Sequence, residues 1–167
     1  MLTDSIKISE INKQDVDEAS ITLFHAFRKD PLIQWIYNDQ WSYETRGLAI
    51  LRTWVKYCML YGKAFKTNNL EAVVLRKKPG DEKLTFWHML RSGMLSTPAI
   101  LGKEAFSRLM EFDNLMMQER KRNMDDKIYW YCWMLGTKPE CQNQGFANAL
   151  MKYTFDMAKK IKITLLS

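Results

Sequence analysis

The most constraining feature of this sequence is an unbroken run of eight apolar and aromatic residues, Ile128–Leu135, which ends at Gly136. A run this short is rich in strand-forming residues and lacks the alternation of a half-exposed strand. It therefore predicts a central strand that is covered on both faces, as in a layered fold. After a short turn, apolar residues recur at helical spacing over Phe146–Ile161, which predicts an amphipathic helix.

The rest of the chain alternates between strand and helix patterns. A strand is predicted at Ile6–Ile11, another at Ile163–Leu166, and a hairpin at Ala64–Thr67 and Leu70–Arg76, where Asn68-Asn69 suits a two-residue turn. Helical spacing predicts the helices Asp15–Phe27, Pro31–Tyr37, Ser42–Tyr61, Leu84–Arg91, Pro98–Leu101 and Lys103–Asn123. These elements predict an α/β (α+β) fold, with a mixed central sheet flanked by helices, in a single domain over residues 1–167.

Composition and charge narrow the class of protein. Apolar residues make up 47% of the chain and charged residues 26%, as in globular domains. The three cysteines and two histidines have no spacing typical of a disulfide framework or a metal site, and we expect neither. No signal-like or membrane-spanning segment is apparent, so we expect a soluble, cytoplasmic protein. The net charge of +6 is divided among short clusters that match no nucleic-acid motif. We interpret them as solvated faces or as an attraction for an anionic ligand, and expect no nucleic-acid or membrane partner.

The junction between the apolar strand and the helix after it, Gln142–Ala147, has the composition of an anion-binding loop. A strand, a short turn, a glycine and a helix leave unpaired backbone N–H groups at the helix N-terminus, where the helix dipole favours negative charge. Gly145 and Ala147 would let a phosphate approach the backbone, and the three amide side chains before Gly145 supply further donors. The alternative is that Gly145 serves only a tight turn from strand to helix.

At these residues the sequence resembles the GNAT superfamily of N-acetyltransferases, whose core motif is a strand followed by Gln/Arg-x-x-Gly-x-Gly/Ala and a helix. Tyr129–Glu140 is also similar to the family pattern, and Phe27–Leu32 and Ala72–Leu75, with Pro79-Gly80 behind it, are similar to one branch of the family. The resemblance covers most of the chain. It implies the acyl-CoA N-acyltransferase fold and an enzyme that transfers an acetyl group from acetyl-CoA to an amine of a small molecule, protein or peptide. The alternative is a non-catalytic acyl-CoA sensor or assembly module with the same fold.

The resemblance also implies a set of cofactor-binding residues. The backbone of Leu135, Gly136 and Thr137 would pair with the pantetheine arm as an added strand would. The pyrophosphate would lie against Gln142, Asn143, Gln144, Gly145, Phe146 and Ala147. In such enzymes an amine attacks the thioester while a base removes its proton, backbone N–H groups polarise the carbonyl and an acid protonates the thiolate.

The sequence departs from the family pattern in two places. Tyr131 occupies the strand position where several members carry a catalytic Glu, and His25, His88, Glu140 and Cys141 are better explained as structural residues, so the catalytic base and acid are unassigned. The family continues past the last helix with a strand, a helix and a closing hairpin, so we expect a C-terminally shortened form. It could act as it stands, form a homo-oligomer through the unfinished sheet edge, or bind acetyl-CoA without turnover.

Overall fold

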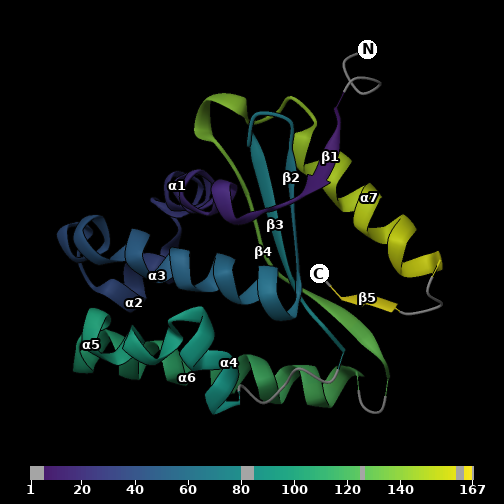
Figure 1. Ribbon diagram of the computed structural model, residues 1–167. Coiled ribbons are helices and arrows are strands. Elements are labelled where there is room, and N and C mark those ends of the chain that lie inside the picture. The colour runs from purple at the N-terminus through teal and green to yellow at the C-terminus, as the bar shows by residue number, and fades with distance from the viewer. Residues whose placement is uncertain (1–5, 80–84, 125–126, 161–163, 167) are drawn as a thin grey trace.

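The computed structural model of the protein describes residues 6–79, 85–124, 127–160 and 164–166, which contain both helices and strands (Figure 1). The strands are β1 (Ile8–Glu10), β2 (Lys63–Thr67), β3 (Ala72–Lys77), β4 (Tyr129–Thr137) and β5 (Thr164–Leu166). The helices are α1 (Val16–Phe27), α2 (Pro31–Tyr37), α3 (Gln40–Tyr61), α4 (Phe86–Ser92), α5 (Thr97–Leu101), α6 (Lys103–Met124) and α7 (Phe146–Lys160). No helix in these described ranges is long and apolar enough to cross a membrane.

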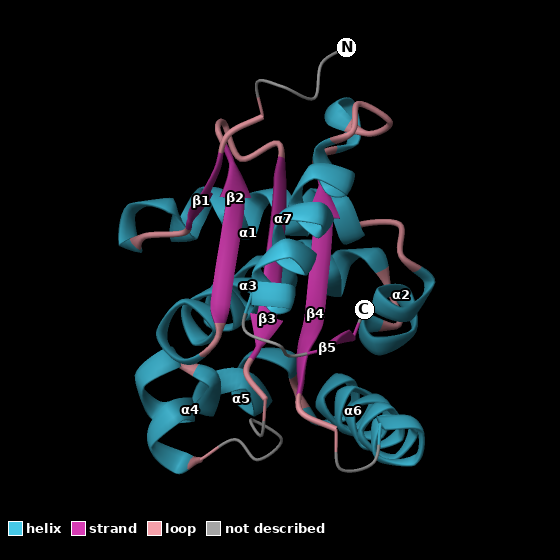
Figure 2. Ribbon diagram, turned by 90° about the vertical axis from the view of Figure 1, so that its right-hand side faces the viewer, coloured by secondary structure: helices cyan, strands magenta, loops and turns pink. Residues whose placement is uncertain are grey.

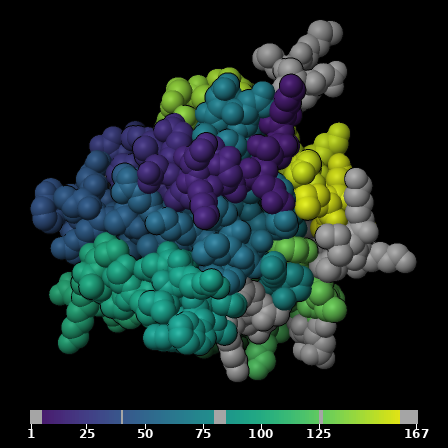
Figure 3. Space-filling model, in the orientation of Figure 1, coloured from purple at the N-terminus to yellow at the C-terminus, as the bar shows by residue number. Residues whose placement is uncertain are grey.

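The five strands form one mixed sheet in the order β1-β2-β3-β4-β5. Neighbouring strands from β1 to β4 are antiparallel, whereas β5 runs parallel to β4. Helices α1 and α3 lie on one side of the sheet and α7 lies on the other (Figures 1 and 2). The segments after β3, from α4 to α6, form the lower part of the molecule in the view of Figure 3. The mixed sheet flanked by helices is therefore confirmed.

The predicted helices are also confirmed, and within the described residues their ends differ from the prediction by at most two residues. The predicted helix ends at Leu84 and Ile161, and the predicted strand start at Ile163, lie outside the described residues. Local capping explains the two boundaries that matter most for the site. At α2, the Asp30 carboxylate accepts hydrogen bonds from the N–H groups of Leu32 (2.9 Å) and Ile33 (3.2 Å), and Pro31 takes the first helical position. At α3, the Asp39 carboxylate accepts from the N–H of Ser42 at 2.6 Å, so this helix begins before the predicted residue.

The strand that is covered on both faces is β3, and the prediction that the run Ile128–Leu135 fills this role is wrong. All six residues of β3 are buried, whereas in β4 only Met134 and Gly136 are. Side chains of β3 alternate between a large core cluster with α1 and α3 and a smaller cluster with α7. Tyr131, Trp133 and Met134 of β4 line one cavity and Leu135 lines another, both described below. Because Met134 and Leu135 also pack with the two core clusters, β4 contributes both to the core and to the cavity linings.

The loop between β2 and β3 also differs from the prediction. It has four residues, 68–71, and the positive φ falls on Leu70 (55°) and not on the Asn68-Asn69 pair. The cause is the Glu71 carboxylate, which accepts hydrogen bonds from Thr67 Oγ1 (2.6 Å), Asn69 N (3.0 Å) and Asn69 Nδ2 (3.0 Å). The conformation of this loop is therefore determined by the side chain of Glu71, and the Asn68-Asn69 pair alone does not predict it.

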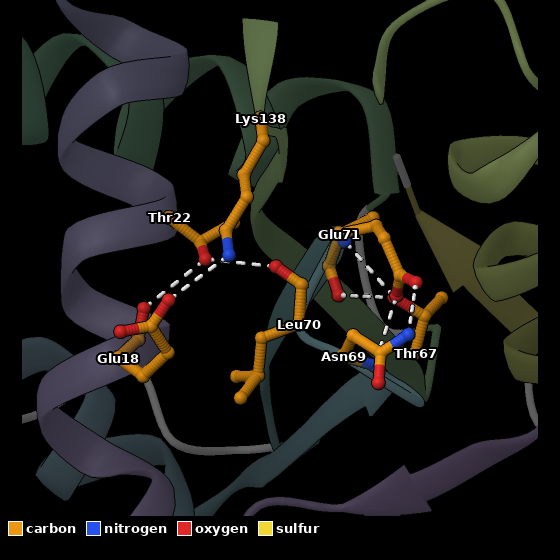
Figure 4. A network of polar contacts seen from close by, with 8 residues as sticks. Glu18, Thr22, Thr67, Asn69, Leu70, Glu71 and Lys138 are labelled. Carbon is orange, nitrogen blue, oxygen red and sulfur yellow. Dashed lines mark hydrogen bonds and ion pairs between the residues drawn. The ribbon is translucent and has the colours of Figure 1, made fainter. Parts of the chain in front are cut away.

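The same loop is held against α1 and the end of β4 (Figure 4). The buried Thr22 hydroxyl donates to the Leu70 carbonyl at 2.9 Å, and the Lys138 N–H donates to the Glu71 carbonyl at 2.8 Å. The Lys138 ammonium forms an ion pair with Glu18 at 2.9 Å. These contacts fix the carboxyl end of β4, from which the candidate site begins.

Glu71→Gln is expected to lower the free energy of unfolding by about 1 kcal/mol at neutral pH, because hydrogen bonds to a carboxylate are stronger than those to an amide. Burial raises the pKa of Glu71, but the hydrogen bonds from Thr67 and Asn69 outweigh it, so the net pKa lies below the usual 4.5. Because the pKa of Glu71 is lower in the folded protein than in the unfolded chain, its carboxylate stabilises the folded protein at pH values above the unfolded-state pKa. This stabilisation is lost as the pH falls through the folded-state pKa. Denaturant unfolding of both proteins should show the difference at pH 7 and its loss in acid.

Glu119→Gln is the matched control for this change. Glu119 pairs with Arg122 on the exposed surface of α6 at 3.1 Å, and such pairs contribute little. If Glu119→Gln lowered the free energy of unfolding as much as Glu71→Gln does, the loop carboxylate would have no special stabilising role.

Candidate functional site

The end of β4, the start of α7 and the α1–α2 junction enclose a cavity of about 630 Å³, here called the cofactor cavity. Its lining comprises Ala26, Phe27, Lys29, Asp30, Pro31, Leu135, Gly136, Thr137, Cys141, Gln142, Asn143, Gly145, Phe146, Ala147 and Asn148. The α1–α2 junction and the segment from the end of β4 to the start of α7, which lie far apart in the sequence, thus meet at one end of the sheet. A cavity of this size accommodates a large part of a cofactor-sized ligand.

The loop before α7 has the backbone expected of an anion site. Gly145 has a φ of 90° and Asn143 a φ of 61°, so the chain turns sharply into the helix. The first helical hydrogen bond runs from Ala149 N to Gly145 O at 3.0 Å. The N–H groups of Phe146, Ala147 and Asn148 therefore have no acceptor within the helix, and all three residues line the cavity.

An open strand edge forms the opposite wall. β5 pairs with β4 only over Tyr129–Tyr131, and in the described part of the chain no strand follows it along Leu135–Thr137. The other edge of this segment is paired with β3. A ligand lying against this edge can form hydrogen bonds with β4 as an added strand would.

Gly136 is required here by close packing with α1. A Cβ at this position would lie 2.9 Å from Ala26 Cβ, 2.9 Å from Leu23 Cδ2 and 3.3 Å from Phe27 Cε2. The absence of a side chain thus lets α1 pack tightly on β4, which places Ala26 and Phe27 on the cavity wall. Gly136 therefore contributes to the site by setting the position of α1.

Eight of the nine predicted cofactor-binding residues line the cavity, which brings them together in space. Gln144 does not line it, because its side-chain amide turns away and donates to the Glu140 carbonyl at 3.0 Å. Cys141 lines the cavity, but burial and the carboxylates of Glu140 and Glu71 raise the pKa of its thiol, which disfavours a nucleophilic thiolate.

The site also contains residues that sequence reasoning missed. Lys29 and Asp30, at the α1–α2 junction, contribute the charged side chains of the cofactor cavity. The available signal was the segment Phe27–Leu32, which resembles one branch of the family. Its position beside the loop before α7 depends on the packing of α1 against β4, which no local pattern reveals.

A second cavity of about 350 Å³, here called the acceptor cavity, adjoins the first. It lies between α2, α6 and β4, and it shares Phe27 and Asp30 with the cofactor cavity. The other lining residues are Leu32, Ile33, Ile36, Trp54, Lys77, Met89, Met94, Leu95, Thr97, Pro98, Phe106, Leu109, Met110, Phe112, Asp113, Tyr131, Trp133 and Met134. The two cavities thus meet at the start of α2.

A β-bulge in β4 lies where the strand passes from one cavity to the other. Met134 is opposite Leu75 and Cys132 is opposite Arg76, which leaves Trp133 without a partner on β3. Trp133 and Met134 consequently both line the acceptor cavity, whereas Leu135 packs with the cluster beneath α7. The bulge therefore lies beside the residues at which the lining of β4 changes from one cavity to the other.

Two solved structures have the same arrangement of elements. One, described as histone acetyltransferase HPA2 and related acetyltransferase from Corynebacterium glutamicum, matches 92% of this chain and 72% of its own, with 18% identity and a TM-score of 0.61. The other, a putative acetyltransferase from Pyrococcus horikoshii, matches 96% of this chain and 78% of its own, with 14% identity and a TM-score of 0.58. The protein has a GNAT-like acetyltransferase fold. No family model and no curated protein matches the sequence.

Within this acetyltransferase fold, neither histidine lines either of the two cavities described here. His88 stacks on Tyr61 with ring centroids 3.9 Å apart, and His25 lies exposed near the end of α1. Tyr131 lines the acceptor cavity beneath the Arg120 guanidinium, 4.2 Å from the ring centroid. Burial raises the pKa of Tyr131 despite that cation. Its phenol therefore stays protonated at neutral pH and can donate a hydrogen bond but not remove a proton.

Proposed function

We propose that the protein is an acetyl-CoA-dependent N-acyltransferase that acetylates an amine. The observation that carries this proposal is the meeting of an open β4 edge with the unpaired amides of α7 in one cavity. A phosphate-bearing, extended ligand fits both features at once, because the amides favour an anion and the edge favours a strand-like chain. The fold of solved acetyltransferases supports the same ligand.

The lining residues fit the parts of acetyl-CoA. The loop from Gln142 to Ala147 would hold the pyrophosphate mainly through backbone N–H groups, and Lys29 supplies the cation of this cavity. The backbone of Leu135–Thr137 would hold the pantetheine arm. Asp30 lies on the same wall, and we assign it to the side of the amine because a carboxylate repels phosphates.

The arrangement also provides a place for the reaction. When bound, acetyl-CoA supplies an activated thioester. An amine that binds as an ammonium first loses a proton to the solvent. The neutral amine nitrogen then bonds to the acetyl carbon, the carbon–sulfur bond breaks, and a second amine proton passes to the sulfur. The bulge leaves Trp133 without a partner on β3, and a backbone N–H group of this segment would stabilise charge on the carbonyl oxygen if it reached the junction of the cavities. The phenol of Tyr131 supplies a further donor in the acceptor cavity.

Acetyl-CoA at about one hundred times its Kd is expected to raise the melting temperature by about 5–10 °C, because a ligand bound only by the native state then contributes about 2.7 kcal/mol. Differential scanning fluorimetry with acetyl-CoA, CoA and ATP would measure this, with ATP as the control for charge alone. Thiol release in the presence of amines would then test turnover. No shift with acetyl-CoA at saturation would contradict the proposal.

A non-catalytic acyl-CoA-binding module is the second candidate. It is favoured by the place of Tyr131, where family members carry a carboxylate, and by the absence of both histidines from the two cavities. Stabilisation by CoA without thiol release from acetyl-CoA, for every amine offered, would support this candidate over the enzyme.

A further inference from the structure

We infer that the acceptor cavity binds a primary monoamine with an apolar body, and that Asp30 holds its ammonium group. The inference rests on the proposed function, because the amine must reach a thioester bound in the cofactor cavity. It goes further by naming the chemical class of the acceptor. The argument uses the lining of the cavity, its charges and the place of Asp30.

The lining of the acceptor cavity is suited to an apolar body. Apart from Thr97, Tyr131 and three charged residues, every lining side chain is hydrocarbon, aromatic or thioether. Aromatic side chains such as Trp54 and Trp133, whose ring centroids lie 5.1 Å apart, contribute large apolar surfaces to the wall. Four methionines, which adapt to irregular shapes, complete the wall: Met89, Met94, Met110 and Met134. A cavity of about 350 Å³ is large enough for one ring on a short chain.

The charges in this cavity select for a single cation. Its charged side chains are Asp30, Asp113 and Lys77, so Lys77 offsets one carboxylate and the lining carries one net negative charge. The Lys77 ammonium lies 3.8 Å from the centroid of the Trp133 ring, so a cation already covers that ring. A second ammonium on the ligand would have to be desolvated among apolar groups beside this cation, which is costly. Polyamines and basic peptides are therefore disfavoured.

Asp30 is placed where the amine of such a ligand must lie. It is the one charged residue that lines both cavities, at their junction. Its Oδ1 is fixed by the N–H groups of Leu32 and Ile33, and no described residue donates to Oδ2. The carboxylate is thus held in one orientation with an oxygen available for an ammonium group. An amine bound there has its nitrogen at the entrance to the cofactor cavity and its apolar body in the acceptor cavity.

Asp30→Asn tests the role of the charge, because asparagine caps a helix as well as aspartate does and so preserves the start of α2. We expect the Kd of 2-phenylethylamine, measured by calorimetry on the CoA-saturated protein, to rise about tenfold or more. The Kd of CoA should stay constant or fall, because a negative charge near its phosphates is removed. The matched control is Asp39→Asn, the same change at the cap of α3, outside both cavities. It should alter neither constant.

Met110→Trp tests the place of the apolar body. Met110 lines the cavity from α6 and is 37% exposed, so a larger side chain can be accommodated at the surface while it narrows the cavity. Binding of tryptamine should weaken more than binding of 2-phenylethylamine. The control is Leu115→Trp, on the same helix but outside the lining, which should leave both amines unaffected.

A panel of 2-phenylethylamine, tryptamine, spermidine and a lysine-containing peptide separates the inference from the proposed function. Binding and thiol release with the two monoamines, at least about tenfold better in kcat/KM than with the polycations, is the expected result. A preference for spermidine or the peptide overturns the inference, and so does an unchanged amine affinity in the Asp30→Asn protein. Neither result contradicts the proposed acyltransferase function. Failure of CoA itself to bind overturns the proposed function, and the acceptor assignment with it.

Discussion

Gly145→Ala is expected to remove most of the stabilisation by acetyl-CoA. Gly145 has a φ of 90°, a region that alanine enters only at a cost of about 1–3 kcal/mol. The loop would relieve this strain by rotating its backbone, and the amides at the start of α7 would lose their common direction. Because neutralisation of the pyrophosphate depends on those amides, the affinity for CoA should fall by about tenfold or more. Melting curves at increasing CoA concentration would measure the loss.

Gly102→Ala is the matched control for that experiment. Gly102 has a φ of 79° and lies before α6, outside both cavities. Both substitutions should lower the melting temperature of the unliganded protein, but only Gly145→Ala should lower the shift caused by CoA. An equal CoA shift in the two variants would show that the backbone of this loop is not part of the binding site.

Gly136→Ala should destabilise the fold and disturb the same site from the other side. The added methyl group would lie 2.9 Å from both Ala26 Cβ and Leu23 Cδ2, so α1 must move away from β4. Such overpacking typically costs about 1–3 kcal/mol, which corresponds to a drop of about 2–12 °C in melting temperature for a chain of this length. CoA binding should weaken as well, because Ala26 and Phe27 on α1 line the cofactor cavity.

A second substitution, Ala26→Gly, tests the cause. It removes one of the two clashing groups, and by itself it should cost about 1 kcal/mol because glycine is a poor helix former. In the Gly136→Ala background it should instead restore part of the lost stability, which a double-mutant cycle would detect as coupling. If the changes in the free energy of unfolding caused by the two substitutions were purely additive, the destabilisation by Gly136→Ala would not arise from contact between α1 and β4.

Much of the fold follows from short-range patterns. Each predicted helix has its apolar stripe and its stop or start signal within a few residues, and α2 begins at Pro31 because Asp30 caps it. The loop before α7 could also be predicted, since Gly145 and the helix after it are adjacent in the sequence. By contrast, the β2–β3 loop depends on hydrogen bonds from the Glu71 side chain and on Thr22 of α1, 48 residues away from Leu70. No local turn signal contains that information.

The apolar run Ile128–Leu135 shows what local sequence decides and what it does not. The sequence by itself determined that this run, from Tyr129 on, forms a strand of a mixed sheet and that a loop with a glycine turn and a helix follow it, because these features depend on local backbone preferences. Tertiary structure alone decided that the strand lines a cavity, that a bulge at Trp133 turns it between two cavities, and that Asp30 stands at their junction. These features arise from packing between segments about one hundred residues apart in the sequence. In addition, an apolar residue that packs in a solid core cannot be distinguished by its type from one that lines a ligand cavity.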